Sequence, residues 1–183
     1  MKLLSRTLLA LYLLILLWLV LFKFSVDLSS VLAYQTRSLN LIPFATVSRD
    51  NLRETIYNFV VFVPLGLLLS VNLKRTTFWR MLAFVFVFSL AVETIQFVFA
   101  IGVTDITDVI TNTSGGLLGL ALYALSSRYV DNKKLDRSIV VAGTVLLILL
   151  VVLLGILFSK NVRYHSPPGT PRHALLSVSP GSS

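Results

Sequence analysis

Long apolar runs dominate the chain, and short clusters of charged residues separate them. The runs at 8–22, 56–73, 81–92, 109–125 and 139–158 contain no Lys, Arg, Asp or Glu. A helix needs about 20 residues to cross the ~30 Å hydrocarbon core of a bilayer. With their flanks these runs reach that length, so we expect membrane helices at about residues 7–25, 55–73, 79–100, 107–126 and 138–159. The expected fold class is all-α, a polytopic membrane helical bundle with five transmembrane helices.

Composition agrees with this interpretation, since 56% of the 183 residues are hydrophobic and only 13% are charged. The alternative for the first run is a cleaved signal peptide, because Lys2 and Arg6 precede an apolar core. The residues that follow, Lys-Phe-Ser-Val-Asp at 23–27, lack a small-residue cleavage site. We therefore expect residues 1–25 to remain as the first membrane helix. The absence of Cys excludes disulfides and thiolate metal sites.

Basic residues predict how the chain lies in the cell membrane. The 101–106 connection has no Lys or Arg, whereas the connection between the last two expected helices has several. Cytoplasmic loops carry an excess of Lys and Arg. The pattern favours a cytoplasmic N-terminus and an extracytoplasmic C-terminus, with these basic residues inside: Lys2, Arg6, Lys74, Arg75, Arg80, Arg128, Lys133, Lys134 and Arg137. Because they flank membrane helices and form no patch on a soluble fold, we expect no nucleic-acid partner.

Two segments lie outside the expected helices. Residues 26–54 are amphipathic, and we expect them to form an interfacial or extracytoplasmic loop with apolar side chains in the lipid and Arg37, Arg49 and Arg53 near phosphates. Residues 160–183 are rich in Ser, Pro and Gly, and we expect a disordered tail.

Polar side chains recur within the apolar runs at helical spacing. Glu93 and Gln96 are three residues apart, and Asp105, Asp108 and Asn112 follow on one face of the next expected helix. A carboxylate near the centre of a membrane helix costs about 3 kcal/mol, so it normally faces protein or water. The short connection at 101–106 makes the two helices antiparallel neighbours. We therefore expect both polar faces to meet near the outer boundary of the membrane.

Two interpretations of this group stay open. Thr104 or Asp105 can cap the helix that follows, with Asp108 in its first turn, while Gly115 and Gly119 let helix backbones approach closely. Asn58 can likewise hydrogen-bond to an adjacent helix or line a pocket. In the functional interpretation, the carboxylates bind a divalent cation or a polar head group. The spacing itself assigns no metal and no cofactor.

The sequence gives little support for catalysis. The chain has no Cys, and its two histidines, His165 and His173, lie in the expected tail, outside the expected membrane helices. There is no phosphate-binding loop and no H-E-x-x-H motif. Paired carboxylates can act as acid and base, so hydrolysis remains an alternative.

Four short motifs occur in order across residues 38–126. They are Asn-Leu-Ile-Pro-Phe at 40–44, Asn58 with Phe-Val-Pro-Leu-Gly at 62–66, Glu93-x-x-Gln96, and Thr-Asp-Ile-Thr-Asp-Val-Ile-Thr-Asn-Thr at 104–113 with the glycines after it. This pattern resembles the VanZ-like family. In that family many members have an Arg in the 100–103 turn and an acidic residue at the position of Thr107, and this chain departs from both.

The resemblance implies a small bacterial multi-pass protein of the cell envelope, in a family whose named member is linked to low-level resistance to teicoplanin, a lipoglycopeptide. It also implies that the family's recurrent polar positions, which are candidate ligand-binding residues, are Asn40, Asn58, Glu93, Gln96, Asp105, Asp108 and Asn112. We expect a protein that is not an enzyme and that recognises an envelope lipid, a lipid-linked cell-wall precursor or the antibiotic at the outer leaflet. The alternatives are a membrane enzyme acting on a lipid-linked phosphate or sugar, with Glu93 or Asp108 as base, and a structural partner subunit.

Overall fold

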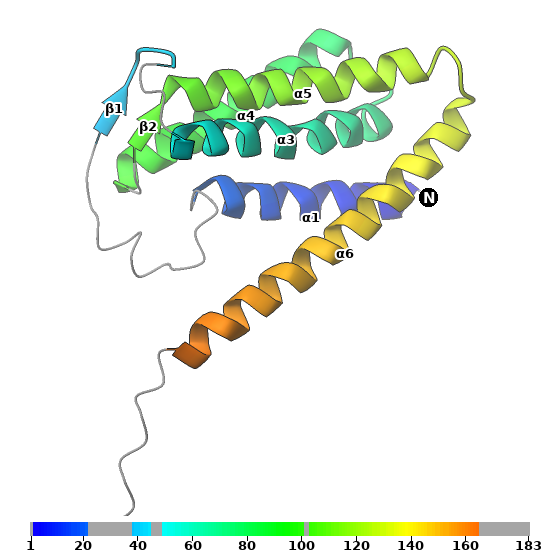
Figure 1. The fold of residues 1–183 in the computed structure, drawn as a ribbon. Helices are drawn as coiled ribbons and strands as arrows, with labels where there is room; N and C mark the ends of the chain where they lie inside the picture. Colours follow the sequence, from blue (N-terminus) through cyan, green and yellow to red (C-terminus); the bar gives the residue numbers. More distant parts are fainter. Residues whose placement is uncertain (1, 22–37, 45–48, 101–102, 165–183) are drawn as a thin grey trace, which may run out of the picture.

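A computed structural model describes residues 2–21, 38–44, 49–100 and 103–164. In chain order these form α1 (Lys2–Leu21), β1 (Ser38–Asn40), α3 (Arg49–Asn72), α4 (Phe78–Phe99), β2 (Val103–Asp105), α5 (Ile106–Ser126) and α6 (Asn132–Tyr164). Helices α1, α3, α4 and α5 lie side by side, and β1 and β2 lie at one end of them (Figure 1).

Five helices, α1, α3, α4, α5 and α6, are long and apolar enough to cross a membrane, which confirms the expected helical bundle. Three of them begin five or six residues earlier than expected, at Lys2, Arg49 and Asn132, and α6 continues to Tyr164. Residues 49–54 of the expected loop are therefore part of α3, and residues 160–164 of the expected tail are part of α6. The reason is physical: a helix continues into the interfacial region, where charged residues are tolerated, whereas an apolar run marks only the hydrocarbon part.

The closest helix packing joins α3 to α5 through glycines. A Cβ atom on Gly119 would lie 2.1 Å from the carbonyl oxygen of Val63, and one on Gly115 would lie 2.0 Å from that of Phe59. From the other side, a Cβ on Gly66 would lie 2.3 Å from the carbonyl oxygen of Gly116. The two backbones therefore touch, as the Gly115 and Gly119 spacing predicted.

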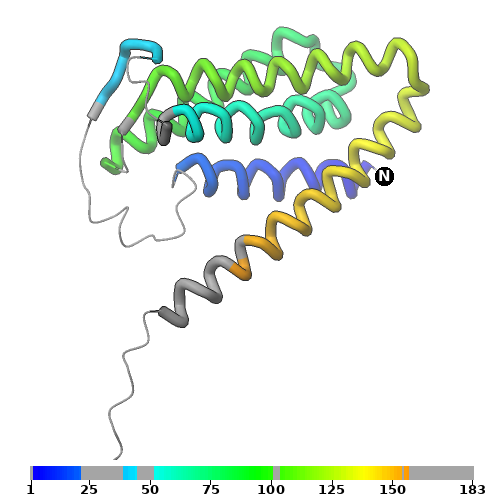
Figure 2. The backbone as a smooth tube through the Cα atoms, in the orientation of Figure 1, coloured from blue at the N-terminus to red at the C-terminus, as the bar shows by residue number. Residues whose placement is uncertain are grey.

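Helix α1 packs against α3 with a buried apolar face that includes Leu8 and Leu16. Tyr12 on that face donates a hydrogen bond of 2.6 Å from its hydroxyl to the carbonyl oxygen of Val61. Helix α6 contacts α1 and α3 with its first part and then diverges from the bundle (Figure 2). Its described apolar residues are mostly exposed, among them Val145, so we expect this helix to face lipid.

Two short strands are an element that the sequence did not predict. β1 and β2 pair in parallel, with Ser38 opposite Val103, Leu39 opposite Thr104 and Asn40 opposite Asp105. Three residues per strand are too few to give a periodic signal, and the pairing joins two connections far apart in the chain. The pairing brings the segment before α3 against the turn between α4 and α5.

Candidate functional site

The end of the bundle that carries β1 and β2 also carries most of the buried polar side chains. We call the following residues the polar cluster: Asn40, Asn58, Glu93, Gln96, Thr104, Asp105, Thr107, Asp108 and Asn112. All of them except Asn40 and Asp105 are buried. The cluster draws on β1, the first half of α3, the end of α4, β2 and the start of α5.

Asp105 joins helix capping to the strand pair. It is the N-cap residue of α5, and its Oδ1 accepts a hydrogen bond of 2.8 Å from the backbone N–H of Thr107. Its other oxygen, Oδ2, accepts one of 2.9 Å from Nδ2 of Asn40, the residue paired with it across the strands. Oδ1 of Asn40 in turn accepts from the backbone N–H of Ile42 at 3.2 Å. The capping interpretation of Asp105 is therefore confirmed, and the same carboxylate fixes β1.

Glu93 holds the turn between α4 and β2. Its Oε2 accepts a hydrogen bond of 3.1 Å from the backbone N–H of Asp105, and its backbone carbonyl accepts one of 3.3 Å from the hydroxyl of Thr104. The side chain is only 2% exposed. The carboxylate therefore stabilises a backbone that leaves α4 through Ala100, which adopts a left-handed conformation with φ 55°.

Asn58 and Asp108 form a buried pair between α3 and α5. Nδ2 of Asn58 donates a hydrogen bond of 2.8 Å to Oδ1 of Asp108, and both residues are buried. Asp108 also lies in the first turn of α5, where the helix dipole favours its charge. The interpretation of Asn58 as a bridge to an adjacent helix is thus confirmed.

Two buried amides, Gln96 and Asn112, complete the cluster. Nε2 of Gln96 donates to the carbonyl oxygens of Val20 at 3.0 Å and Leu21 at 3.3 Å, which are backbone acceptors at the end of α1. Nδ2 of Asn112 donates to the hydroxyl of Ser89 at 2.9 Å. Within the described part of the chain, the carbonyl oxygens of both amide side chains have no hydrogen-bond partner. They are acceptors held in the bundle interior.

Thr107 and Ser89 are members of this network that the sequence analysis did not select as site residues. The hydroxyl of Thr107 accepts a hydrogen bond of 3.1 Å from the backbone N–H of Phe44, which ties the segment after β1 to α5. Phe44 has φ 55°, a backbone conformation that residues other than glycine rarely adopt, so this bond helps to hold a strained turn. Small hydroxyl side chains are common in membrane helices, and no spacing rule distinguishes these two.

A cavity of about 210 Å³ opens beside the cluster. Its walls are mostly apolar and come from β1, the residues after it, α4 and α5: Leu39, Leu41, Leu90, Phe97, Ile106 and Val109. Glu93, Thr94, Thr104 and Asp105 also border the cavity, but almost all of the surface that it exposes is apolar. The arrangement is a small, partly open apolar hollow with two carboxylates at its side.

The three carboxylates do not all line one cavity. Glu93 and Asp105 line the cavity, but Asp108 faces Asn58 between α3 and α5 and does not line it. Among the residues that the structure describes, no group of three His, Cys, Asp or Glu side chains is placed to hold a metal ion. Capping gives Asp105 the backbone N–H of Thr107 as a partner, and helix pairing gives Asp108 the amide of Asn58.

Of the three arginines that we expected to bind a ligand, the structure describes the side chain of Arg53. Arg37 lies outside the described residues, and so does the side chain of Arg49, the first residue of α3. Arg53 is an exposed residue in the first turns of α3, at the same end of the bundle as the polar cluster.

Known proteins match this chain over most of its length. The model of the VanZ/LLP1 family matches residues 9–127. The chain belongs to the VanZ/LLP1 family. It is 58% identical to a protein named Protein VanZ from Enterococcus faecium, over 151 residues that make up 82% of this chain and 92% of that protein. No solved structure matches it.

The family match extends further than the motifs suggested. It includes α1, which lies outside the 38–126 core of the sequence resemblance, and it ends before α6. The packing gives a reason for this extent, because α1 contributes the carbonyls that Gln96 binds and the tyrosine that binds α3. All members of the polar cluster lie within the matched region. The protein is therefore a VanZ-family protein with five helices able to span a membrane.

Proposed function

We propose that this VanZ-family protein acts in the cell membrane by recognising an amphiphile at the outer leaflet, an envelope lipid or a lipoglycopeptide antibiotic such as teicoplanin. Through that recognition it contributes to teicoplanin resistance. The observation that carries the proposal is the apolar cavity between β1, α4 and α5, with Glu93 and Asp105 at its border. Family membership supports the resistance context.

The lining of the cavity favours one kind of ligand. Leu39, Leu90 and Phe97 offer an apolar surface that suits an acyl chain. The carboxylates of Glu93 and Asp105 beside these walls are negatively charged, so they disfavour an anionic group in the cavity. A lipoglycopeptide combines an acyl chain with peptide and sugar donors. We therefore place the antibiotic ahead of a phosphate-bearing lipid at this cavity.

The distribution of charge supports an outward-facing cavity. The positive-inside rule assigns the connections rich in Lys and Arg to the cytoplasm. Those connections, between α3 and α4 and between α5 and α6, lie at the end of the bundle opposite β1 and β2 (Figure 1). The cavity then opens at the outer leaflet, where a cell-wall antibiotic or a lipid-linked precursor is present.

A matched pair of variants on α4 tests the proposal. Phe97→Ala removes part of the cavity wall, whereas Phe86→Ala removes the same side chain from a comparably exposed position away from the cavity. We expect the Phe97 variant to lower the teicoplanin resistance of an expressing host while the Phe86 variant retains it, at equal protein levels. Equal resistance in both variants would remove the cavity from the mechanism.

A binding measurement separates the antibiotic from an envelope lipid. Teicoplanin added to the purified wild-type protein in detergent should raise its unfolding temperature, and the Phe97→Ala variant should show a smaller rise. If teicoplanin has no effect on the wild type but Phe97→Ala still abolishes resistance in cells, the ligand is an envelope lipid.

A further inference from the structure

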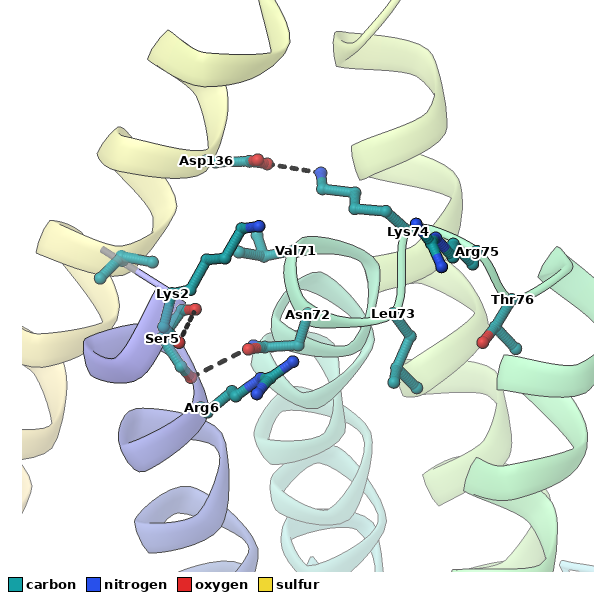
Figure 3. Close-up of a pocket in the computed structure, with 11 residues that line it drawn as sticks. Lys2, Ser5, Arg6, Val71, Asn72, Leu73, Lys74, Arg75, Thr76 and Asp136 are labelled. Carbon is teal, nitrogen blue, oxygen red and sulfur yellow. Dashed lines mark hydrogen bonds and ion pairs between the residues drawn. The ribbon is translucent and has the colours of Figure 1, made fainter.

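A second cavity lies at the opposite end of the bundle from the polar cluster. It has a volume of about 570 Å³ and is enclosed by the start of α1, the end of α3, the connection after α3 and the start of α6 (Figure 3). Four cationic side chains line it, Lys2, Arg6, Lys74 and Arg75, against one carboxylate, that of Asp136. We call it the basic cavity.

One of these cations already has its partners. Nζ of Lys74 lies 2.7 Å from Oδ1 of Asp136 and also donates to the hydroxyl of Tyr123. Partial burial lowers the pKa of Lys74, but the hydrogen bonds to Asp136 and Tyr123 outweigh that effect and leave the pKa above its usual value. The carboxylate in the wall of the cavity is thus neutralised by a lysine that stays charged.

The other three cations have no such partner. Within the described ranges, the side chains of Lys2, Arg6 and Arg75 form no ion pair, and Figure 3 shows them around the same hollow. Like charges gathered without a counter-ion repel one another, and a bound anion would relieve that repulsion. The backbone around them is fixed by Asn72, which donates to the carbonyl oxygens of Ser5 at 3.2 Å and Leu68 at 2.9 Å.

We propose that the basic cavity binds a phosphate group, supplied by the headgroup of an anionic phospholipid. Arginine presents a planar fork of donors that fits phosphate oxygens, and lysine adds a point charge. Basic hollows between membrane helices at the positively charged face of a membrane protein are suited to anionic headgroups. A soluble phosphate shares this chemistry, and the experiment below distinguishes the two sources.

The surroundings of the cavity favour a lipid. It lies where membrane-spanning helices end, at the level expected for headgroups. Leu3 and Leu4 on α1 and Val141 on α6 are more than half exposed in the turns next to it, which leaves apolar surface for acyl chains. This site does not depend on the function proposed for the polar cluster, because the two lie at opposite ends of the bundle and share no residue.

The test uses the full chain, purified in a neutral detergent, with the unfolding temperature as readout. Phosphatidylglycerol, zwitterionic phosphatidylcholine and inorganic phosphate are titrated separately. The variant Arg6→Gln/Arg75→Gln removes two cations from the cavity. The control Arg80→Gln/Arg128→Gln removes the same charge from the same end of the bundle, at exposed positions that do not line the cavity.

We expect phosphatidylglycerol to stabilise the wild type and the control at similar concentrations, and phosphatidylcholine to have little effect. The cavity variant should need on the order of tenfold more phosphatidylglycerol for the same shift. Stabilisation by inorganic phosphate at equal concentration would assign the site to a soluble anion. The proposal is overturned if the control variant loses as much stabilisation by phosphatidylglycerol as the cavity variant does. It is also overturned if neither phosphatidylglycerol nor inorganic phosphate stabilises the wild type.

A second measurement applies if the cavity variant does not fold. The stabilisation of the wild type by phosphatidylglycerol should weaken as salt rises, because ion pairs in a partly open cavity are screened. A shift that does not change with salt would contradict binding through Lys2, Arg6 and Arg75.

Discussion

Asn58 of α3 and Asp108 of α5 are 50 residues apart in sequence and joined by a buried hydrogen bond of 2.8 Å. The amide of Asn58 donates a hydrogen bond to the buried carboxylate of Asp108, and this bond offsets part of the cost of burying that carboxylate. In membrane proteins such pairs contribute about 0.6 kcal/mol on average, with a maximum near 1.7. The bond fixes the register of α3 against α5 close to the polar cluster.

Removal of either partner should therefore destabilise the fold. We expect Asn58→Ala to lower the free energy of unfolding by about 1–3 kcal/mol, since it takes a donor from a buried carboxylate. A double-mutant cycle with Asp108→Ala, followed by unfolding in detergent, gives the coupling energy of the pair. Additive effects of the two substitutions would show that the bond contributes nothing.

The glycine contacts between α3 and α5 give a sharper prediction. Gly119→Ala should destabilise the protein by about 1–3 kcal/mol, because the added Cβ would lie 2.1 Å from the carbonyl oxygen of Val63 and force the helices apart. Gly155→Ala in α6 is the matched control, since nothing lies within 4 Å of its Cβ position. It should be neutral or slightly stabilising through helix propensity. Equal melting temperatures for both variants would contradict the close contact.

Asp105 allows capping and strand bridging to be separated. Asp105→Asn keeps a side-chain oxygen that accepts from the Thr107 N–H, so the helix cap remains. The new amide group places a donor opposite Nδ2 of Asn40, so the hydrogen bond to β1 is lost. Asp105→Ala loses both and should be less stable than the Asn variant by about 1 kcal/mol. Thermal unfolding of the two purified variants measures the difference. Indistinguishable variants would mean that the cap contributes little.

Lys74 should make stability depend on pH in a defined direction. Its folded-state pKa is raised above 10.5, so its contribution is complete below that value and is lost as pH rises through the folded-state pKa. The pair with Asp136 is partly exposed, with side chains 43% and 24% accessible, so Lys74→Met should cost only about 0.2–1 kcal/mol near neutral pH. The difference in unfolding temperature between the Lys74→Met variant and its parent should become smaller at alkaline pH.

This comparison is best made in a Tyr123→Phe background, because Tyr123 carries a hydroxyl that hydrogen-bonds to both Lys74 and Asp136. A gap that stays constant up to strongly alkaline pH would show that Lys74 acts by packing and not by charge.

Short-range features of this protein could be predicted from the sequence. The five spans follow from the length of apolar runs, and the cap at Asp105 and the close approach at Gly115 and Gly119 follow from rules that hold within one or two helical turns. Helical spacing also selected the buried residues: Glu93 and Asn112 are at most 2% exposed. Local chemistry decided these features, so the chain alone was enough.

Tertiary structure decided which partner each polar group has. Polar groups inside a bilayer find their hydrogen-bond partners mainly within the protein, but periodicity gives only the face of a helix and not the atom opposite it. Asn40 therefore meets Asp105 across 65 residues, and Gln96 meets Val20 across 76, through contacts that no spacing rule contains. The same long-range packing separated Asp108 from Glu93 and Asp105, and it gathered Arg6 and Arg75 around one cavity. These arrangements depend on how whole helices pack against one another, so they become visible only in the folded chain.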